Sequence, residues 1–345
     1  MKTIAMIITL GLLLLTGACQ KSEYLSEGDF FYLENKEAKM PVWVNGNFDS
    51  NVMIIFVHGG PGDSGISHST TPGWNYVEED YMVVYWDQRF SGIAQGDPDL
   101  STMNPKQFVE DLDKLVQVIQ NKYPEKDLFI CGHSWGGMLS SAYLGENNNA
   151  SKFKGWIDLD GSIYAELETQ LMKDWILERV PAELAKPDAD VEFWQFIIDW
   201  YEENPNPGNY TGYEPYWYVS NLRGDAVDWE KTQEEYPTPY VELIFRSMFS
   251  LSYYVYSFGN PEDVIEWDAV DCTPALQNIT IPALLLWGAN DGVVPTTVAD
   301  YVYDHLATDP SQKEIVLIDE CGHGPHVEKP DAFYDAVRNF IETNK

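Results

Sequence analysis

The fold is decided by one stretch in the first half of the chain, Leu128-Phe129-Ile130-Cys131-Gly132-His133-Ser134-Trp135-Gly136-Gly137. Its apolar first part predicts a buried strand, and the residues that follow Gly137 are typical of a helix. Glycines stand two positions before and two positions after Ser134, where a tight turn leaves no room for side chains. This strand–turn–helix order predicts a nucleophile elbow, which lifts the serine hydroxyl above the sheet edge. A simple small-residue turn is the alternative interpretation.

Further apolar runs flank this stretch on both sides and predict more buried strands. They end near residues 57, 86, 160, 287 and 318, and helix-like segments such as 105–123 separate them. Strands that alternate with helices indicate a parallel sheet with right-handed crossovers. Residues 31–47 instead predict one or two hairpins. We therefore expect an α/β fold, a mostly parallel sheet with helices on both faces.

The alternation stops at Ser162 and resumes at Ile281, which indicates a long insertion. The intervening stretch is rich in Trp and Tyr and is typical of helices, among them a segment at 238–258. We divide the chain into an α/β core at 20–161 and 272–345 and a helical cap at 162–271. Because the insertion leaves from the carboxyl end of a strand, we expect it to cover the edge where such sheets bind ligands.

The first 19 residues have the pattern of a targeting segment. Lys2 precedes an apolar run from Ile4 to Leu15, and Thr16-Gly17-Ala18-Cys19 follows. An apolar run of this length is typical of a signal peptide and is too short to span a bilayer. Small residues before Cys19 resemble the lipobox of bacterial lipoproteins. We therefore expect a lipoprotein signal at 1–19, lipid attachment at Cys19 and a place on the bacterial cell envelope; the alternative is a secreted or periplasmic protein.

The charge of the chain is strongly acidic, with 21 basic and 55 acidic residues and a net charge of −34. Such a surface repels phosphate backbones, so we exclude nucleic acid as a partner. Half of the net charge lies in residues 165–271, which hold 23 acidic and 6 basic residues. An acidic cap favours a substrate with a free amine, whereas an ordinary solvated acidic surface is the alternative explanation.

Apart from the predicted lipid-bearing Cys19, the chain has three cysteines: Cys131, Cys272 and Cys321. An odd number argues against a complete disulfide framework, although Cys272 and Cys321 can form one pair if they lie close together. The cysteines and histidines show no metal-ligand spacing, so we expect no metal site.

Chemically suggestive residues follow the ends of several predicted strands: His58, Asp87, Ser134, Asp291 and His323. The carboxyl ends of parallel strands share one edge of the sheet, so these residues are expected to converge there. Ser134, Asp291 and His323 follow the chain order of a Ser–Asp–His triad. In that arrangement His323 takes the proton of the Ser134 hydroxyl and Asp291 orients the imidazole. This chemistry requires no cofactor and no metal.

These motifs together resemble the α/β-hydrolases, and within them the proline iminopeptidase group of serine aminopeptidases. The most specific local signal is His58-Gly59-Gly60-Pro61-Gly62, placed directly after a buried strand. The resemblance implies that the backbone N–H groups of Gly60 and Trp135 form the oxyanion hole. It also implies an aminopeptidase acting on a small-molecule or short peptide substrate, whose N-terminal ammonium is bound by carboxylates of the cap.

Two features depart from that group: Phe90 follows Asp87-Gln88-Arg89, and His133 precedes Ser134, as in general esterases. A carboxylesterase or a carbon–carbon bond hydrolase of the same fold is therefore the alternative. A ligand-binding lipoprotein without catalysis is a third.

Several other residues compete for roles in the site. His326 lies three positions from His323, but His323 follows the last strand directly and is the better candidate for the base. Asp263 is the alternative to Asp291, although it follows no predicted strand. We expect His58 and His133 to be structural, His68 and His305 to lie at the surface or in packing positions, and Asp87 to pair with Arg89.

Overall fold

The computed structural model describes residues 28–206, 214–236 and 270–345. The predicted signal peptide with Cys19, the predicted helical segment 238–258 and the candidate Asp263 lie outside these residues. Within the described ranges, no helix has the length and apolar character needed to cross a membrane.

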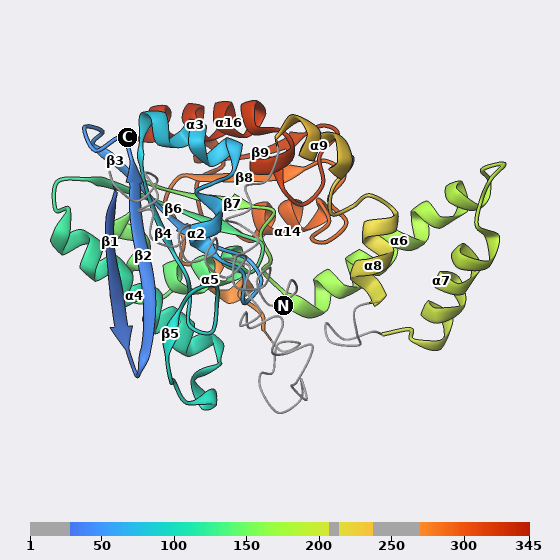
Figure 1. Cartoon of the computed structure of the whole chain (residues 1–345), viewed down its shortest axis with the longest axis horizontal. Coiled ribbons are helices and arrows are strands. Elements are labelled where there is room, and N and C mark those ends of the chain that lie inside the picture. Colours follow the sequence, from blue (N-terminus) through green and yellow to red (C-terminus); the bar gives the residue numbers. More distant parts are fainter. Residues whose placement is uncertain (1–27, 207–213, 237–269) are drawn as a thin grey trace, which may run out of the picture.

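One mixed sheet forms the centre of the molecule (Figure 1). Its strands run in the spatial order β1-β2-β4-β3-β6-β7-β8-β9, and the short β5 pairs with β2. The hairpin of β1 and β2 is antiparallel to β4, while every later neighbour is parallel. The strands have these bounds: β1 Asp29–Asn35, β2 Ala38–Gly46, β3 Val52–Val57, β4 Met82–Trp86, β5 Gln95–Gly96, β6 Asp127–His133, β7 Gly155–Leu159, β8 Ala283–Gly288 and β9 Lys313–Ile318.

The central strands are almost entirely apolar because they are covered on both faces, and Asp158 of β7 is the exception. Every residue of β3, β4, β7 and β8 is buried. Alternate side chains enter two separate apolar clusters, so Ile55 packs with α4, α5 and α14, whereas Ile54 packs with α3 and α16. The helices around the sheet have these bounds: α2 Gly65–His68, α3 Pro72–Asp80, α4 Pro105–Lys122, α5 Trp135–Leu144, α13 Thr273–Leu276, α14 Thr297–His305, α15 Pro325–Glu328 and α16 Pro330–Asn344. This confirms the predicted α/β fold.

Local sequence fixes where these helices begin. In α4, the side chain of Asn104 caps the helix by accepting the N–H of Gln107, and Pro105 occupies the first turn. Both are favoured at helix N-termini. The buried stripe Phe108, Leu112, Leu115, Val116 and Ile119 then docks α4 on the sheet.

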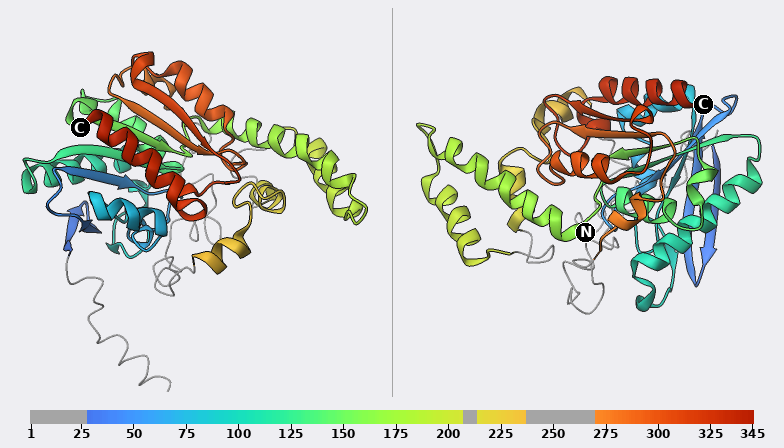
Figure 2. Two further views of the ribbon diagram at one scale, coloured as in Figure 1. Left: turned by 90° about the horizontal axis from the view of Figure 1, so that it is seen from above. Right: turned by 180° about the vertical axis from the view of Figure 1, so that it is seen from behind.

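The insertion between β7 and β8 has a core of its own. Its described helices are α6 Ala165–Leu184, α7 Val191–Glu203, α8 Glu214–Asn221 and α9 Trp229–Glu235. Trp175, Trp194 and Tyr218 are buried at the centre of an apolar cluster made by α6, α7 and α8. Helices α6 and α7 project away from the sheet, and α9 lies near α15 (Figures 1 and 2). The predicted cover over the sheet edge is therefore provided, among the described residues, by the segment of α8 and α9.

Candidate active site

The elbow stands where β6 ends and α5 begins. Ser134 has φ +55° and ψ −125°, a conformation that L-residues rarely adopt. The glycines on either side are required by close packing, because a Cβ at Gly132 would collide with the carbonyl of Gly136, and a Cβ at Gly136 with the carbonyl of Val57. The backbone N–H of Ser134 donates to the carbonyl of Leu159 at 3.1 Å, which anchors the elbow to the end of β7.

The register of the parallel strands aligns their carboxyl ends at one edge of the sheet. Val57 pairs with Gly132, and His133 pairs with Leu159. At the other side of the edge, Gly288 pairs with Ile318. The loops that follow β3, β6, β7, β8 and β9 therefore meet at one place.

Two of the predicted site residues from these loops, His323 and Asp291, are hydrogen-bonded to each other. His323 Nδ1 lies 2.7 Å from Asp291 Oδ2, so the ring donates its Nδ1 proton to the carboxylate. Asp291 is fully buried, and its Oδ1 accepts the N–H groups of Val293 and Val294 at 2.8 and 3.0 Å. The carboxylate is thus held on both oxygens and orients the imidazole.

His323 is placed by contacts from two directions. Its backbone carbonyl accepts a hydrogen bond from His133 Nε2 at 3.0 Å, and its backbone N–H donates to the carbonyl of Asp225 at 2.8 Å. Burial lowers the pKa of His323 to about 4, and the negative charge of Asp225 opposes this shift. The ring is therefore neutral at pH 7, which is the state a general base requires.

The loop after β3 runs beside the elbow. A Cβ added at Gly59 would lie 3.0 Å from the Cβ of Ser134, so only glycine fits there. Gly60 has φ +112° and is exposed at this turn. Trp135 is the first residue of α5. Trp135 thus follows Ser134 directly, and the neighbour of Gly60, Gly59, lies against the elbow.

Gln88 forms hydrogen bonds to both His58 and Trp135, and it was not among the residues predicted for the site. Its backbone N–H donates to His58 Nε2 at 3.1 Å, and its side-chain amide donates to the carbonyl of His58 at 2.9 Å. Its Oε1 accepts the indole N–H of Trp135 at 3.0 Å. Burial lowers the pKa of His58 to about 4, in keeping with the predicted structural role.

The predicted ion pair between Asp87 and Arg89 is wrong. Asp87 accepts hydrogen bonds from Ser64 Oγ and from the N–H groups of Ile66 and Ile93. Arg89 instead forms a fully buried two-point contact with Asp111 of α4, with Nε 2.5 Å and Nη2 2.8 Å from the carboxylate. The backbone and hydroxyl donors around Asp87 occupy its carboxylate, and Arg89 finds its buried partner on α4 instead.

His68, His133 and His326 form a buried cluster beside the site, so His68 has the packing role that was one of its two expected roles. His305 lies apart from them, half-buried against Tyr301 of α14. His68 Nδ1 and His326 Nε2 are 3.0 Å apart, and both rings are buried. His133 packs against His323, His326 and His68 with ring centroids 5.1, 5.0 and 5.9 Å away. Burial lowers the pKa of His133 and that of His326 well below the usual value. His133 and His326 are therefore neutral packing partners, and His326 has no bond to Asp291 in the structure.

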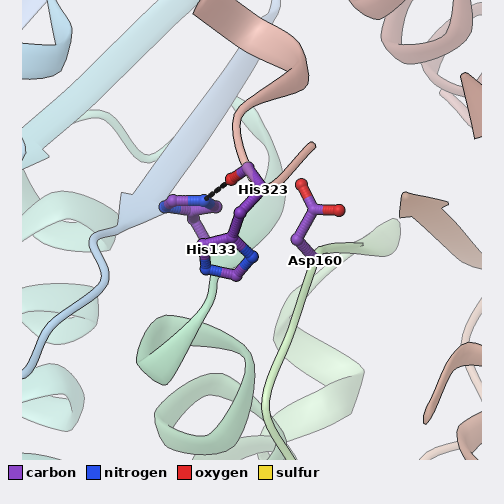
Figure 3. A group of neighbouring side chains, drawn as sticks. All are labelled: His133, Asp160 and His323. Atoms are coloured by element: carbon purple, nitrogen blue, oxygen red, sulfur yellow. Dashed lines mark hydrogen bonds between the residues drawn. The ribbon is translucent and has the colours of Figure 1, made fainter. Parts of the chain in front are cut away.

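Asp160 also lies at this edge. Figure 3 shows it with His133 and His323; one ligand atom from each of the three lies within 4.8 Å of the other two. Such a set can hold a metal ion in principle. Here, however, His323 Nδ1 is bonded to Asp291, and Asp160 Oδ1 accepts the N–H of Gly288 at 2.8 Å. These two hydrogen bonds hold His323 and Asp160 in an arrangement suited to proton chemistry.

A cavity of about 1030 Å³ opens beside His323 and His133. Carboxylates from the core and from the insertion line it: Asp63, Asp225, Asp228, Glu230, Glu235 and Glu328. Arg223 is the one arginine or lysine in this lining, which comes from described residues alone. The site is therefore a neutral imidazole at the wall of a strongly anionic cavity.

The three cysteines of the described residues are buried free thiols. Cys272 Sγ lies 3.5 Å from the carbonyl of Met138, whereas Cys321 lies beside Glu328. The pair that the sequence leaves open is not formed.

Comparison with known proteins agrees with this geometry. Residues 49–183 match the family model described as serine aminopeptidase, S33. The chain is 27% identical to a proline iminopeptidase of Heyndrickxia coagulans over 305 residues, 86% of this chain and 93% of that protein. It is 22% identical to the "Probable aminopeptidase YbaC" of Bacillus subtilis over 318 residues, 87% and 92% of the two chains.

The fold has close counterparts among solved structures. A proline iminopeptidase-related protein of Thermus thermophilus superposes with a TM-score of 0.62 at 20% identity, covering 92% of this chain and 98% of that one. At this identity the likeness concerns the fold. The chain therefore has the α/β-hydrolase fold, and in sequence it is similar to the serine aminopeptidases of the S33 family and to proline iminopeptidases.

Proposed function

We propose that the protein is an aminopeptidase of proline iminopeptidase type, which releases a small or proline-like N-terminal residue through an acyl–Ser134 intermediate. The observation that carries the proposal is the His323–Asp291 bond at the wall of an anionic cavity. A free amine next to the scissile carbonyl is the group that such a cavity attracts, because opposite charges reinforce binding where water is excluded.

The proposed chemistry uses Ser134 as the nucleophile, His323 as the base and Asp291 as the acid that orients the base. His323 donates Nδ1–H to Asp291, so Nε2 carries the lone pair that accepts the proton of the Ser134 hydroxyl. The Ser134 oxygen attacks the substrate carbonyl, and Asp291 stabilises the imidazolium. His323 then returns the proton to the leaving amine, and water hydrolyses the acyl enzyme by the same route. The N–H groups of Gly60 and Trp135 donate to the oxyanion, where loss of one such donor typically costs about 3–4 kcal/mol.

Asp225 is our candidate for binding the substrate ammonium. It belongs to the insertion, lines the cavity and is exposed, and its backbone carbonyl bonds the N–H of His323. Its charge acts directly on His323. The α-amine of an aminopeptidase substrate lies one atom from the reacting carbonyl, so its carboxylate partner must stand beside the catalytic base.

A substrate panel tests the proposed reaction. We expect turnover of aminoacyl and prolyl chromogenic amides, and covalent labelling of Ser134 by a fluorophosphonate. Ser134→Ala, the matched control, abolishes both without loss of folding. Turnover of simple acyl esters with none on free-amine substrates would instead establish the esterase alternative. Absence of labelling in the folded protein would leave only the ligand-binding alternative.

Asp225→Asn separates amine binding from catalysis. We expect KM for an aminoacyl amide to rise about tenfold or more, since a charge-assisted contact is lost, while kinetics on a neutral acyl ester stay the same. Glu230→Gln, which also removes one negative charge from the cavity lining, serves as the control and leaves both substrates nearly unaffected. Equal effects of the two variants would rule out Asp225 as the specific partner.

We further propose that Cys19 carries the lipid that holds the protein on the cell envelope. The support is the sequence pattern of residues 1–19 alone. Metabolic labelling with a fatty acid in a bacterial host, compared between the natural chain and Cys19→Ser, tests it. Equal labelling of the two would favour secretion or release into the periplasm.

A further inference from the structure

We propose that Asp160 is a positioning residue, a carboxylic acid that keeps its proton and donates a hydrogen bond to Asp291, thereby fixing the carboxylate that orients His323. The inference rests on the function proposed above. It concerns a side chain outside the predicted triad, which lies 131 positions before Asp291 on the other side of the insertion.

Asp160 is held rigidly against the strand that leads to Asp291. It follows β7 directly, is fully buried and has φ +46°, a backbone conformation that is uncommon outside glycine. Its backbone N–H donates to Leu286 at 2.9 Å, and its Oδ1 accepts the N–H of Gly288 at 2.8 Å. The carbonyl of Gly288 in turn accepts the N–H of Asp291 at 3.0 Å. Both acids are thus anchored to the last residue of β8.

Asp160 Oδ2 is buried, and no N–H or O–H group of the described residues donates to it. The carboxyl group of Asp291 is its neighbour and acts on it as a hydrogen-bonding partner. A carboxylate has only acceptors, so a bond between two carboxyl groups requires a proton on one of them. Two buried charges of the same sign this close would also repel strongly. The pair therefore carries one negative charge.

The hydrogen bonds decide which group holds the proton. Asp291 accepts the N–H groups of Val293, Val294 and His323, and all three bonds favour the charged form. Asp160 accepts a single N–H, that of Gly288. Burial raises the pKa of Asp160 well above its usual value, and the charge of Asp291 raises it further. Burial also raises the pKa of Asp291, but its hydrogen bonds, including the one from Asp160, oppose that shift.

The surroundings strengthen this assignment. The titratable groups that act on the pair or lie beside it are Glu328, Asp158, Cys131, His133 and His323. The two carboxyls and the thiol add no positive charge, and burial keeps the two rings neutral. Among the described residues, no lysine or arginine acts on Asp160 or Asp291 to stabilise a second negative charge.

The consequence for catalysis is geometric. Asp291 accepts backbone N–H groups on Oδ1 and the ring N–H of His323 on Oδ2. Asp160 adds one more donor, which resists rotation of the carboxylate away from His323. Without that donor, Asp291 has a free lone pair, becomes more basic and is held less firmly. A neutral donor of the same shape should replace Asp160: the amide oxygen of Asn can accept the N–H of Gly288 while its N–H₂ donates to Asp291.

The test compares Asp160→Asn with Asp160→Ala on the best substrate of the panel, over a range of pH. We expect Asp160→Asn to keep kcat within about threefold and to leave the acidic limb of the pH profile in place. Asp160→Ala should lower kcat by about 10- to 100-fold with little change in KM. Its acidic limb should move to higher pH, because a more basic Asp291 raises the proton affinity of His323.

Two results would overturn the proposal. Equal loss in both variants would mean that a charged carboxylate is needed at Asp160, and full activity with an unmoved limb in Asp160→Ala would mean that the position is only structural. Should the alanine variant not fold, the infrared difference spectrum of the natural protein minus Asp160→Asn at pH 7 decides. The carbonyl band of a protonated acid is expected, and a carboxylate band in its place contradicts the assignment.

Failure of the proposed function is distinguishable from failure of this inference. If Ser134 is not labelled by a fluorophosphonate and no substrate is hydrolysed, the function is wrong, while the infrared band still reports the state of Asp160. If labelling and turnover occur and the two variants behave alike, only the role of Asp160 is wrong.

Discussion

His323 can act as a base only while its ring is neutral, so its burial has a direct effect on the pH profile. Burial lowers the pKa of His323 to about 4, so the proton is absent throughout the neutral range. We expect kcat/KM to stay level as pH falls from 7 and to decline only as pH falls towards about 4–5. The control is the pH dependence of folding, followed by fluorescence over the same range. An acidic limb centred near 6.5 in a folded enzyme would show that His323 titrates like a free histidine.

The backbone of Ser134 stores strain that glycine would relieve. With φ +55° and ψ −125°, any side chain at this position is crowded. We expect Ser134→Gly and Ser134→Ala to be equally inactive, but the glycine variant to be more stable by about 1 kcal/mol. Urea denaturation of the two variants measures this difference. Equal stabilities would mean that neighbouring contacts, and not the residue itself, hold the turn in place.

At the scale of elements, the Arg89–Asp111 contact joins the loop after β4 to α4. Both groups are fully buried, so removing one leaves an uncompensated charge. We expect Arg89→Met to lower the free energy of unfolding by about 3–5 kcal/mol, and the double variant with Asp111→Leu to recover part of that loss. A urea-denaturation cycle measures the coupling. Simple additivity of the single losses would contradict the paired role, and combining Arg89→Met with Asp87→Asn is the control in which additivity is expected.

Much of the fold could be predicted because hydrophobic runs mark strands buried on both faces. The expected strand at 128–131 is the centre of β6, and the hairpin, the elbow and the closing helix lie where the sequence places them. Strand ends also located Asp291 and His323, since parallel strands share one edge. The same reasoning could have selected Asp160, which follows β7 directly.

Other parts of the site depend on contacts that sequence spacing does not encode. The pairing of Arg89 was misassigned to its near neighbour Asp87, although Asp111 gave a signal: it is a carboxylate within the apolar stripe of α4, beside Phe108 and Leu112. His68 and His326 are 258 positions apart and meet only because the sheet brings their loops together. Gln88 acts through three bonds to groups that only the folded chain places around it.

At the scale of the whole molecule, the excess of negative charge acts on any charged substrate that approaches. The net charge of −34 and the carboxylates of the cavity lining attract an aminoacyl substrate and are indifferent to a neutral ester. We expect kcat/KM for an aminoacyl amide to fall about threefold or more between low and high salt, as the field is screened. A neutral acyl ester measured in parallel is the control. An identical salt response for the two substrates would show that the field plays no part in recognition.

The two ends of the insertion meet at a narrow neck: Tyr164 forms a bridge with Asp271, and Ile163 accepts the N–H of Cys272 at 2.9 Å. The insertion therefore leaves and rejoins the sheet at one point. Its described helices α6, α7 and α8 form an apolar cluster of their own. Evolution can therefore exchange this module by recombination at the neck. A new lineage would inherit the same reaction with a different choice of substrate, because the residues proposed to make and break bonds are all encoded outside the exchanged piece.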